Sequence, residues 1–258
     1  EARLDPSGPG YFRWKGAVDR LLAALLLIPA LPLIGLLVVI VRRNSPGPGI
    51  FRQIRAGRNG VTFTMYKIRT MRMDAEAATG PVWTRPGDPR ITGLGRFLRK
   101  LHLDELPQLF NVLRGEMSLV GPRPERPEFI AALEAEIPGY CSRLTVLPGV
   151  TGLAQINLPP DTDLDSVRRK QALDLEYIRT AGPWLDARMM LCTCLRLFGC
   201  SGEHAMRLMR VQRYVPQADD EPQDEPAEEE PQDAAANSAT SAGVNVAFSI
   251  TASAGDFR

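Results

Sequence analysis

The segment RKLHLDELPQLFNVLRGEMSLVGPRPER, residues 99–126, is the part of the sequence around which the rest can be interpreted. Its adjacent carboxylates, Asp104 and Glu105, are followed by Pro107. A proline fits the first turn of a helix but not its interior, where it lacks a donor and clashes with the preceding turn. We therefore expect a helix to begin near Glu105 or Leu106, with Asp104 at or beside its N-cap. The free N–H groups at that end favour anions, including phosphate.

A second feature of the same segment is the sequence Gly121-Pro122-Arg123-Pro124, which predicts a stiff turn presenting one guanidinium. The planar guanidinium is well suited to binding phosphate. Together with the acid pair and the helix start, this turn indicates phosphoryl chemistry. Spacing alone leaves a plainer interpretation open, because an Asp before a helix is most often only a cap and a first-turn Glu often only complements the helix dipole.

The 21-residue sequence DELPQLFNVLRGEMSLVGPRP, residues 104–124, resembles the signature of the bacterial sugar transferases, which are monotopic phosphoglycosyl transferases. The similarity extends from about Lys15 to about Leu197. Members of this family move a sugar 1-phosphate from a nucleoside-diphosphate sugar to a polyprenyl phosphate. They begin the synthesis of capsule, exopolysaccharide, O-antigen or glycoprotein glycans, and the sequence does not distinguish among these.

The resemblance implies a mechanism in which Asp104 attacks the β-phosphate of a UDP-sugar and UMP departs. Undecaprenyl phosphate then attacks the phosphosugar–aspartate intermediate, which gives the polyprenyl diphosphate sugar. Glu105 would hold a Mg²⁺ ion, since Mg²⁺ is usually bound by one or two carboxylates together with phosphate oxygens. The predicted phosphate- or substrate-binding residues are Arg99, Arg123, Lys67, Arg69 and Asp174. From the sequence alone, Lys67 and Arg69 can equally be solvated strand residues.

The net charge of +1 averages two unlike regions of the 258-residue chain. Residues 215–258 carry ten acidic residues and one basic residue, a charge of −9, which leaves +10 for the rest. A basic body suits a protein that meets anionic lipids and phosphates. Nucleic acid would accept the same charge, but the sequence has no recognisable nucleic-acid-binding motif, so we predict no such partner. The four cysteines form no pair of CxxC motifs and are expected to be reduced, mostly packed thiols in a cytosolic setting.

The segment KGAVDRLLAALLLIPALPLIGLLVVIVRR, residues 15–43, has no charged residue between Leu21 and Val41. Such a run usually indicates a membrane-spanning helix. However, Pro29 and Pro32 interrupt it, and each half of about 10 residues, or ~15 Å, covers only half of a ~30 Å hydrocarbon core. Basic residues flank both ends, whereas a spanning helix carries its positive excess on one side. We therefore predict a re-entrant helix–break–helix, with a straight span as the alternative.

The family resemblance supports the same interpretation of this segment. Pro32 matches the proline of the Ser-Pro pair at which the family's membrane helix breaks, and Leu31 stands where the serine is usual. Lys15 and Asp19 match residues at the entrance of that helix. These three matching residues, Lys15, Asp19 and Pro32, are therefore predicted to determine membrane re-entry, and the protein is predicted to lie on the cytoplasmic face of the bacterial inner membrane.

The remaining pattern predicts an α+β fold, mostly helical and monotopic, with one small β-hairpin. Ile50–Arg55 and Val61–Arg69 are the predicted strands, joined by a tight turn at Asn59-Gly60. The predicted helices are 91–101, 127–136, 163–180 and 184–199. The last one is amphipathic and suited to the membrane surface, with a buried core helix as the alternative.

These expectations divide the chain into four regions. Residues 1–12 are predicted to be disordered, residues 13–43 to form the re-entrant hairpin, and residues 44–214 to form the cytoplasmic catalytic domain. Residues 215–258 are acidic, rich in Pro and then in Ala and Ser, and should be disordered because they bury too little apolar surface. The sequence leaves the sugar and a homo-oligomeric state open. Two other functions are also open, namely a non-catalytic membrane adaptor and direct transfer in a ternary complex.

Overall fold

The computed structural model describes residues 10–77, 80, 82–85, 87–197 and 199–215. Within these residues the protein is mostly helical, with two small two-stranded sheets and one long apolar helix near the N-terminus. All four cysteines are free. The disorder predicted for residues 1–9 and 216–258 concerns residues outside the described ranges. Tyr11 and Phe12, predicted to be disordered, instead begin the first helix. The Phe12 ring packs edge-on against the Tyr177 ring, and the Tyr11 hydroxyl donates to Asp186.

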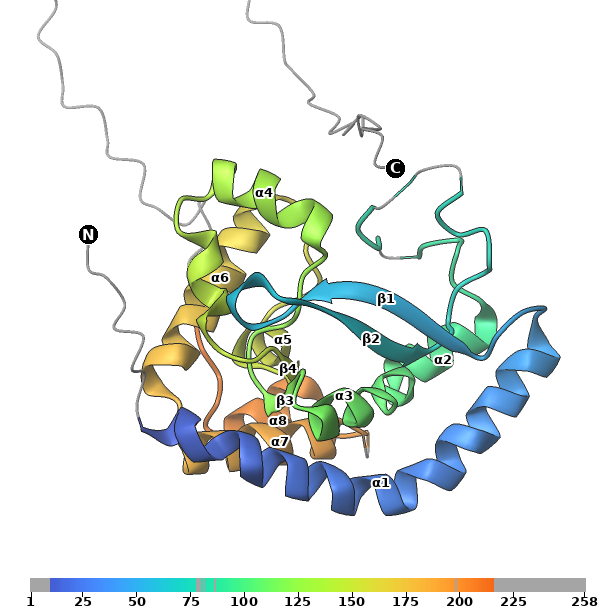
Figure 1. Cartoon of the computed structure of the whole chain (residues 1–258), viewed down its shortest axis with the longest axis horizontal. Helices are drawn as coiled ribbons and strands as arrows, with labels where there is room; N and C mark the ends of the chain where they lie inside the picture. The colour runs from blue at the N-terminus through green and yellow to red at the C-terminus, as the bar shows by residue number, and fades with distance from the viewer. Residues whose placement is uncertain (1–9, 78–79, 81, 86, 198, 216–258) are drawn as a thin grey trace, which may run out of the picture. The chain divides into compact units, whose positions relative to one another are not determined.

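The first helix, α1 (Tyr11–Asn44), is continuous and contains both Pro29 and Pro32. The predicted break is therefore absent from this helix, which curves along one side of the body instead (Figure 1). A helix can absorb proline by bending, because the lost donor and the clash affect only the local turn. By length and composition α1 could cross a membrane. Its re-entrant path remains a prediction.

One stripe of α1 packs against the protein and the other is exposed. The buried stripe recurs every three or four residues and contacts α3, β2 and β3. Its members are Lys15, Asp19, Ala23, Leu27, Ala30, Ile34, Leu37 and Val41. The opposite face exposes large apolar side chains such as Leu21, Leu25 and Ile28. An apolar face of this extent on one helix is the kind of surface that a lipid environment would cover.

The predicted hairpin is confirmed. Strand β1 (Ile50–Ala56) pairs antiparallel with β2 (Thr62–Ile68), in a register that sets Ile50 opposite Ile68. The connecting turn η1 (Arg58–Gly60) places Asn59 in the left-handed region at φ 57°, a conformation that asparagine tolerates better than most residues.

A second, parallel pair, β3 (Ser118–Val120) and β4 (Gly149–Thr151), was not predicted. Strands of three residues carry too short a pattern to be recognised. The remaining helices are α2 (Gly93–Lys100), α3 (Gln108–Arg114), α4 (Pro127–Glu136), α5 (Leu153–Asn157), α6 (Leu164–Thr180), α7 (Pro183–Leu197) and α8 (Gly202–Met209), with 3₁₀ turns η2 (Leu103–Glu105) and η3 (Tyr140–Thr145). The predicted helices at 91–101, 127–136, 163–180 and 184–199 correspond to α2, α4, α6 and α7.

Helix α7 was predicted to be either an amphipathic surface helix or a buried core helix, and it has features of both. Met189 and Cys192 are fully buried in the core, while Trp184 and Leu191 are exposed. In Figure 1 the helix lies next to the first half of α1, together with α8. The helix is therefore a core element that also exposes apolar side chains.

Candidate active site

The acid pair lies in the tight turn η2 between α2 and α3. The turn is closed by bonds from the Glu105 N–H to the His102 carbonyl and from the Leu106 N–H to the Leu103 carbonyl, at 3.2 and 3.4 Å. Helix α3 begins at Gln108, later than the predicted start near Glu105 or Leu106. Pro107 is the N-cap of this helix, where its missing N–H removes no intrahelical hydrogen bond.

Glu105 joins two cations through one oxygen. Its Oε1 accepts from the Lys67 Nζ and from the Arg123 Nη2, each at 2.9 Å. Lys67 comes from β2, and Arg123 comes from the turn that follows β3. Three residues predicted for the site are thus brought together from segments far apart in the sequence.

Asp104 is buried beside this cluster and, within the described residues, accepts no hydrogen bond and forms no ion pair. Burial raises the pKa of the Asp104 carboxyl, and the neighbouring Glu105 raises it further, while Lys67, Arg99 and Arg123 lower it. Arg99 is held close by, with its Nε donating to the Thr70 Oγ1 at 2.8 Å. The carboxylate is therefore not engaged by any of the three cations near it.

Burial and neighbouring charges shift the pKa values of Glu105 and the cations around it in opposite directions. Burial raises the pKa of Glu105, but Lys67 and Arg123 outweigh it and hold that pKa well below its usual range. Burial lowers the pKa of Lys67 to about 8, despite the opposing effect of Glu105. Burial also lowers the pKa of Arg99, and Asp104 opposes that shift. Near neutral pH the cluster holds an ionised Glu105 between protonated cations.

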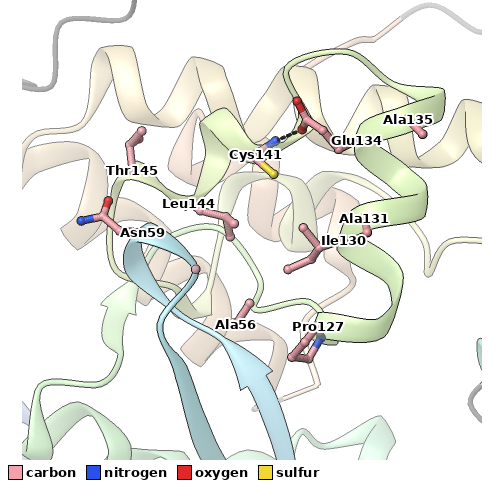
Figure 2. Close-up of a pocket in the computed structure, with 11 residues that line it drawn as sticks. Ala56, Asn59, Pro127, Ile130, Ala131, Glu134, Ala135, Cys141, Leu144 and Thr145 are labelled. Carbon is pink, nitrogen blue, oxygen red and sulfur yellow. Dashed lines mark hydrogen bonds between the residues drawn. The ribbon is translucent and has the colours of Figure 1, made fainter. Parts of the chain in front are cut away.

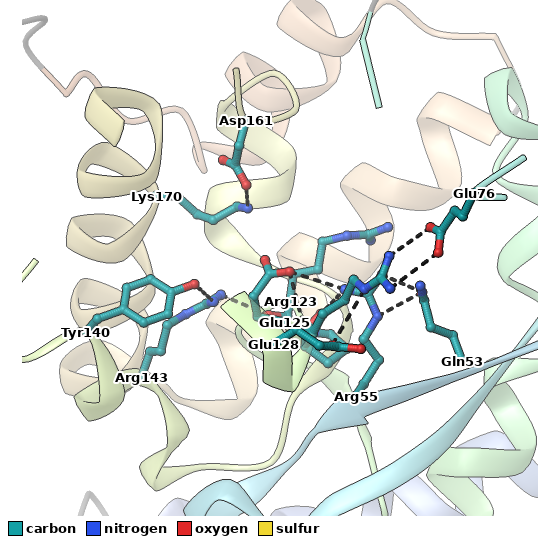
Figure 3. Close-up of polar contacts among 12 residues, drawn as sticks. Gln53, Arg55, Glu76, Arg123, Glu125, Glu128, Tyr140, Arg143, Asp161 and Lys170 are labelled. Carbon is teal, nitrogen blue, oxygen red and sulfur yellow. Dashed lines mark hydrogen bonds and ion pairs between the residues drawn. The ribbon is translucent and has the colours of Figure 1, made fainter. Parts of the chain in front are cut away.

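The turn that carries Arg123 is bonded by several other elements. Arg143 Nη2 donates to the Arg123 carbonyl at 2.9 Å, and Arg55 Nη1 donates to the Pro124 carbonyl at 3.0 Å. The Pro122 and Glu125 carbonyls accept from the N–H groups of Gly149 and Ala56. Figure 3 shows Arg55 and Arg143 on the two sides of this turn. The backbone that positions the Arg123 guanidinium is thereby fixed.

Asp174 was predicted to bind phosphate or substrate, but the structure places it behind this turn. Its Oδ2 lies 2.5 Å from the Arg143 Nη2, and both side chains are 1% exposed. The pair supports the backbone of Arg123. Sequence reasoning missed Arg143 and Arg55, because their partners are backbone carbonyls and only the fold brings them to the turn.

The other predicted residues lie away from the cluster. The Arg69 guanidinium donates to the Ser45 and Pro46 carbonyls, at 2.8 and 2.5 Å, just after α1 ends. Lys15 and Asp19 are buried at the start of α1 and form an ion pair at 3.1 Å. Pro32 lies inside α1.

Comparison with known proteins assigns the family. Residues 11–200 match the family model described as bacterial sugar transferase. The chain belongs to the bacterial sugar transferase family.

Three relatives illustrate the similarity. An undecaprenyl-phosphate glucose phosphotransferase of Komagataeibacter xylinus is 43% identical over 70% of this chain and 35% of its own length. A UDP-glucose:undecaprenyl-phosphate glucose-1-phosphate transferase of Caulobacter vibrioides is 42% identical, over 69% of this chain and 67% of its own length. A UDP-N-acetylgalactosamine-undecaprenyl-phosphate N-acetylgalactosaminephosphotransferase of Aeromonas hydrophila is 41% identical, over 72% of this chain and 44% of its own length. The match thus spans less than half of the first and third of these proteins.

An open groove of about 840 Å³ lies between the hairpin tip, α4 and η3 (Figure 2). Its lining is mostly apolar and includes Ile130, Leu144 and Cys141, with no Lys, Arg or His among the lining residues. Its one carboxylate, Glu134, already accepts from the N–H groups of Gly139 and Cys141. A diphosphate is therefore better matched by the cluster at Glu105 than by this groove.

The donor set also limits how a metal ion can bind. Among the described residues there is no group of three or more His, Cys, Asp or Glu side chains that could hold one. Asp104 and Glu105 do fit the manner in which Mg²⁺ takes one or two carboxylates and completes its coordination with phosphate oxygens and water. A Mg²⁺ ion at this site would therefore depend on the phosphate groups for most of its ligands.

Proposed function

We propose that this protein transfers a sugar 1-phosphate from a UDP-sugar to undecaprenyl phosphate, which yields UMP and an undecaprenyl diphosphate sugar. The observation that carries the proposal is Asp104, a buried carboxylate without a direct partner among the described residues, facing three cations. Such an acid is available to bond to phosphorus. The family assignment and the names of the relatives support the same reaction.

In the first step of the proposed mechanism, an Asp104 oxygen attacks the β-phosphorus of the UDP-sugar. The bond from that phosphorus to the bridging oxygen breaks, and UMP leaves with the electron pair. In the second step, an oxygen of undecaprenyl phosphate attacks the same phosphorus and displaces the Asp104 carboxylate. An ionised carboxylate needs no base for the first step, and carboxylates are known nucleophiles toward phosphoryl groups.

Lys67, Arg99 and Arg123 are proposed to bind the two phosphates and stabilise the charge on the leaving UMP. Preorganised cations lower such a barrier because they need not reorient during the reaction. Glu105 holds Lys67 and Arg123 at one point and so sets their positions. When bound by Glu105 and the diphosphate, Mg²⁺ would neutralise part of the developing charge.

Membrane association has a chemical purpose in this proposal. The acceptor is a lipid-borne phosphate, so a protein held at the headgroup level searches for it within a surface. The exposed apolar face of α1 supports this placement. We propose that α1 is re-entrant, with both ends on the cytoplasmic face of the bacterial inner membrane.

The reaction is tested with purified protein in membranes that contain undecaprenyl phosphate. A panel of UDP-sugars, including UDP-glucose and UDP-N-acetylgalactosamine, is supplied with Mg²⁺, and UMP is measured. We expect release with at least one sugar, and Asp104→Asn should lower it by a factor of at least about 10³. As a matched control, Asp165→Asn removes a partly exposed carboxylate of α6 and should leave the rate unchanged.

The alternative functions give different results in this assay. A non-catalytic membrane adaptor releases no UMP from any sugar, with or without the acceptor. Full release by Asp104→Asn would likewise contradict the proposed role of that carboxylate. Direct transfer in a ternary complex releases UMP only when the acceptor lipid is present.

A further inference from the structure

A buried polar network joins the start of α1 to the protein body. It connects four elements, α1, β3, α6 and α7. Its side chains are those of Tyr11, Lys15, Asp19, Ser118, Tyr177 and Asp186. All are buried except Tyr11, which is half-buried.

The two carboxylates of the network share one ammonium group. The Lys15 Nζ lies 2.5 Å from the Asp186 Oδ2 and 3.1 Å from the Asp19 Oδ2. Hydroxyl groups supply the remaining donors. Asp186 accepts from the Tyr11 and Tyr177 hydroxyls, at 2.7 and 3.0 Å, and Asp19 accepts from the Ser118 hydroxyl at 2.6 Å. Buried carboxylates with this many donors are held in one geometry.

Both body-side hydroxyls also reach the Val120 carbonyl. The Tyr177 hydroxyl lies 3.0 Å from this oxygen, and the Ser118 hydroxyl lies 2.8 Å from it. Each hydroxyl has one proton and donates to one acceptor at a time, so the carboxylates and the carbonyl share the same two protons. The position of the Val120 carbonyl is therefore tied to Asp19 and Asp186.

Val120 is the last residue of β3 and comes three residues before Arg123. Gly121 and Pro122 between them are already bonded to β4, through the Thr151 carbonyl and the Gly149 N–H. Pro122 also has a fixed φ angle. A displacement of Val120 is thus transmitted along a short, restrained backbone to the Arg123 guanidinium.

We propose that Asp186 is a positioning residue for the sugar-phosphate transfer: together with Tyr177 it couples the first turns of α1 to Val120 and so sets Arg123 relative to the membrane helix. This inference rests on the proposed function for its effect on rate. The coupling itself can be measured without activity. It assigns Lys15 and Asp19 to the buried stripe of α1, which packs against the protein body, and not to the exposed apolar face.

The test uses the full chain in membranes and measures hydrogen exchange over residues 118–126. Asp186→Asn and Tyr177→Phe should each speed exchange in this segment by about tenfold, while exchange in α4 stays unchanged. The same variants should lower kcat by about tenfold, with the KM for the UDP-sugar changed by less than about twofold, because Lys67 and Arg99 still bind the diphosphate. A merely structural role would lower the amount of folded protein, but the folded fraction would keep the wild-type kcat and KM.

A double-mutant cycle makes the test sharper. If both residues act through the Val120 carbonyl, the kcat of the double variant should lie within about twofold of the kcat of either single variant. Glu176→Gln is the matched control, since Glu176 adjoins Tyr177 but pairs with Arg213 instead of the network. If Asp186→Asn does not fold, Tyr177→Phe, which removes only a hydroxyl, decides the question.

Two outcomes would overturn the inference: normal exchange over residues 118–126 in the folded variants, or multiplicative losses in the double variant. A wild-type protein that releases no UMP would contradict the proposed function instead. In that case the exchange measurement still tests the coupling, because it requires no substrate.

Discussion

At the scale of single residues, Lys67 is a cation of the candidate site whose charge changes at mildly alkaline pH. Its ammonium is buried against Glu105, and burial lowers its pKa to about 8. The protonated form is therefore lost as the pH rises through about 8, well below the range of an ordinary lysine. The proposed mechanism needs that form, because a neutral amine cannot offset the charge of a diphosphate.

This predicts an alkaline limb in the pH profile. The kcat/KM for UMP release should fall as the pH rises above about 8. Lys67→Arg keeps a positive charge at high pH, so this variant should lose the limb while retaining part of its activity at pH 7. A wild-type profile that stays flat up to pH 10 would show that Lys67 is not needed in its charged form.

At the scale of elements, the hairpin and helices α4 and α6 could be predicted because each carries a complete local signal. Examples are the Asn59-Gly60 turn between alternating strands, and Asp163, which caps α6 in a capping box. Strands β3 and β4 could not be predicted, since three-residue strands are stabilised by their pairing across the fold. The continuity of α1 was missed for a similar reason, because packing against the body compensates for its prolines.

The pairing of β3 and β4 depends on a close backbone approach. A Cβ atom added at Gly149 would lie 2.1 Å from the Gly121 nitrogen. Gly149→Ala should therefore force the strands apart and lower the free energy of unfolding by about 2 kcal/mol or more. Thermal unfolding measures this effect. Gly182→Ala, where an added Cβ meets nothing within 4 Å, should show no comparable loss and serves as the control.

At the scale of the whole molecule, the acid pair, Lys67 and Arg123 were predicted to share a site, and they do lie together. The family motif could identify these residues, since each is part of a continuous sequence pattern. Arg55 and Arg143, which donate to the backbone carbonyls around Arg123, could not be identified in this way. Asp174 and Arg69 were also predicted as ligands, and that role stays a prediction. In the structure Asp174 binds Arg143, and Arg69 binds backbone carbonyls.

The path of α1 through the membrane is a prediction at this scale. In a background in which the four native cysteines are replaced by serine, cysteines introduced at Arg13 and at Arg43, near the two ends of α1, should both react with an impermeant thiol reagent added from the cytoplasmic side. Neither should react from the opposite side. The control is a variant with a cysteine at the exposed position Arg207 of α8. Labelling of the two α1 positions from opposite sides would establish a spanning helix and contradict the re-entrant proposal.

The covalent intermediate on Asp104 is the central claim, and intact-protein mass spectrometry tests it most directly. Wild-type protein is mixed with a UDP-sugar and Mg²⁺ without undecaprenyl phosphate, and the mass is recorded after quenching. We predict an added sugar phosphate on the peptide containing Asp104, with about one UMP released per protein molecule and none from Asp104→Asn. Full transfer in the presence of the acceptor, with neither adduct nor UMP in its absence, would contradict the account.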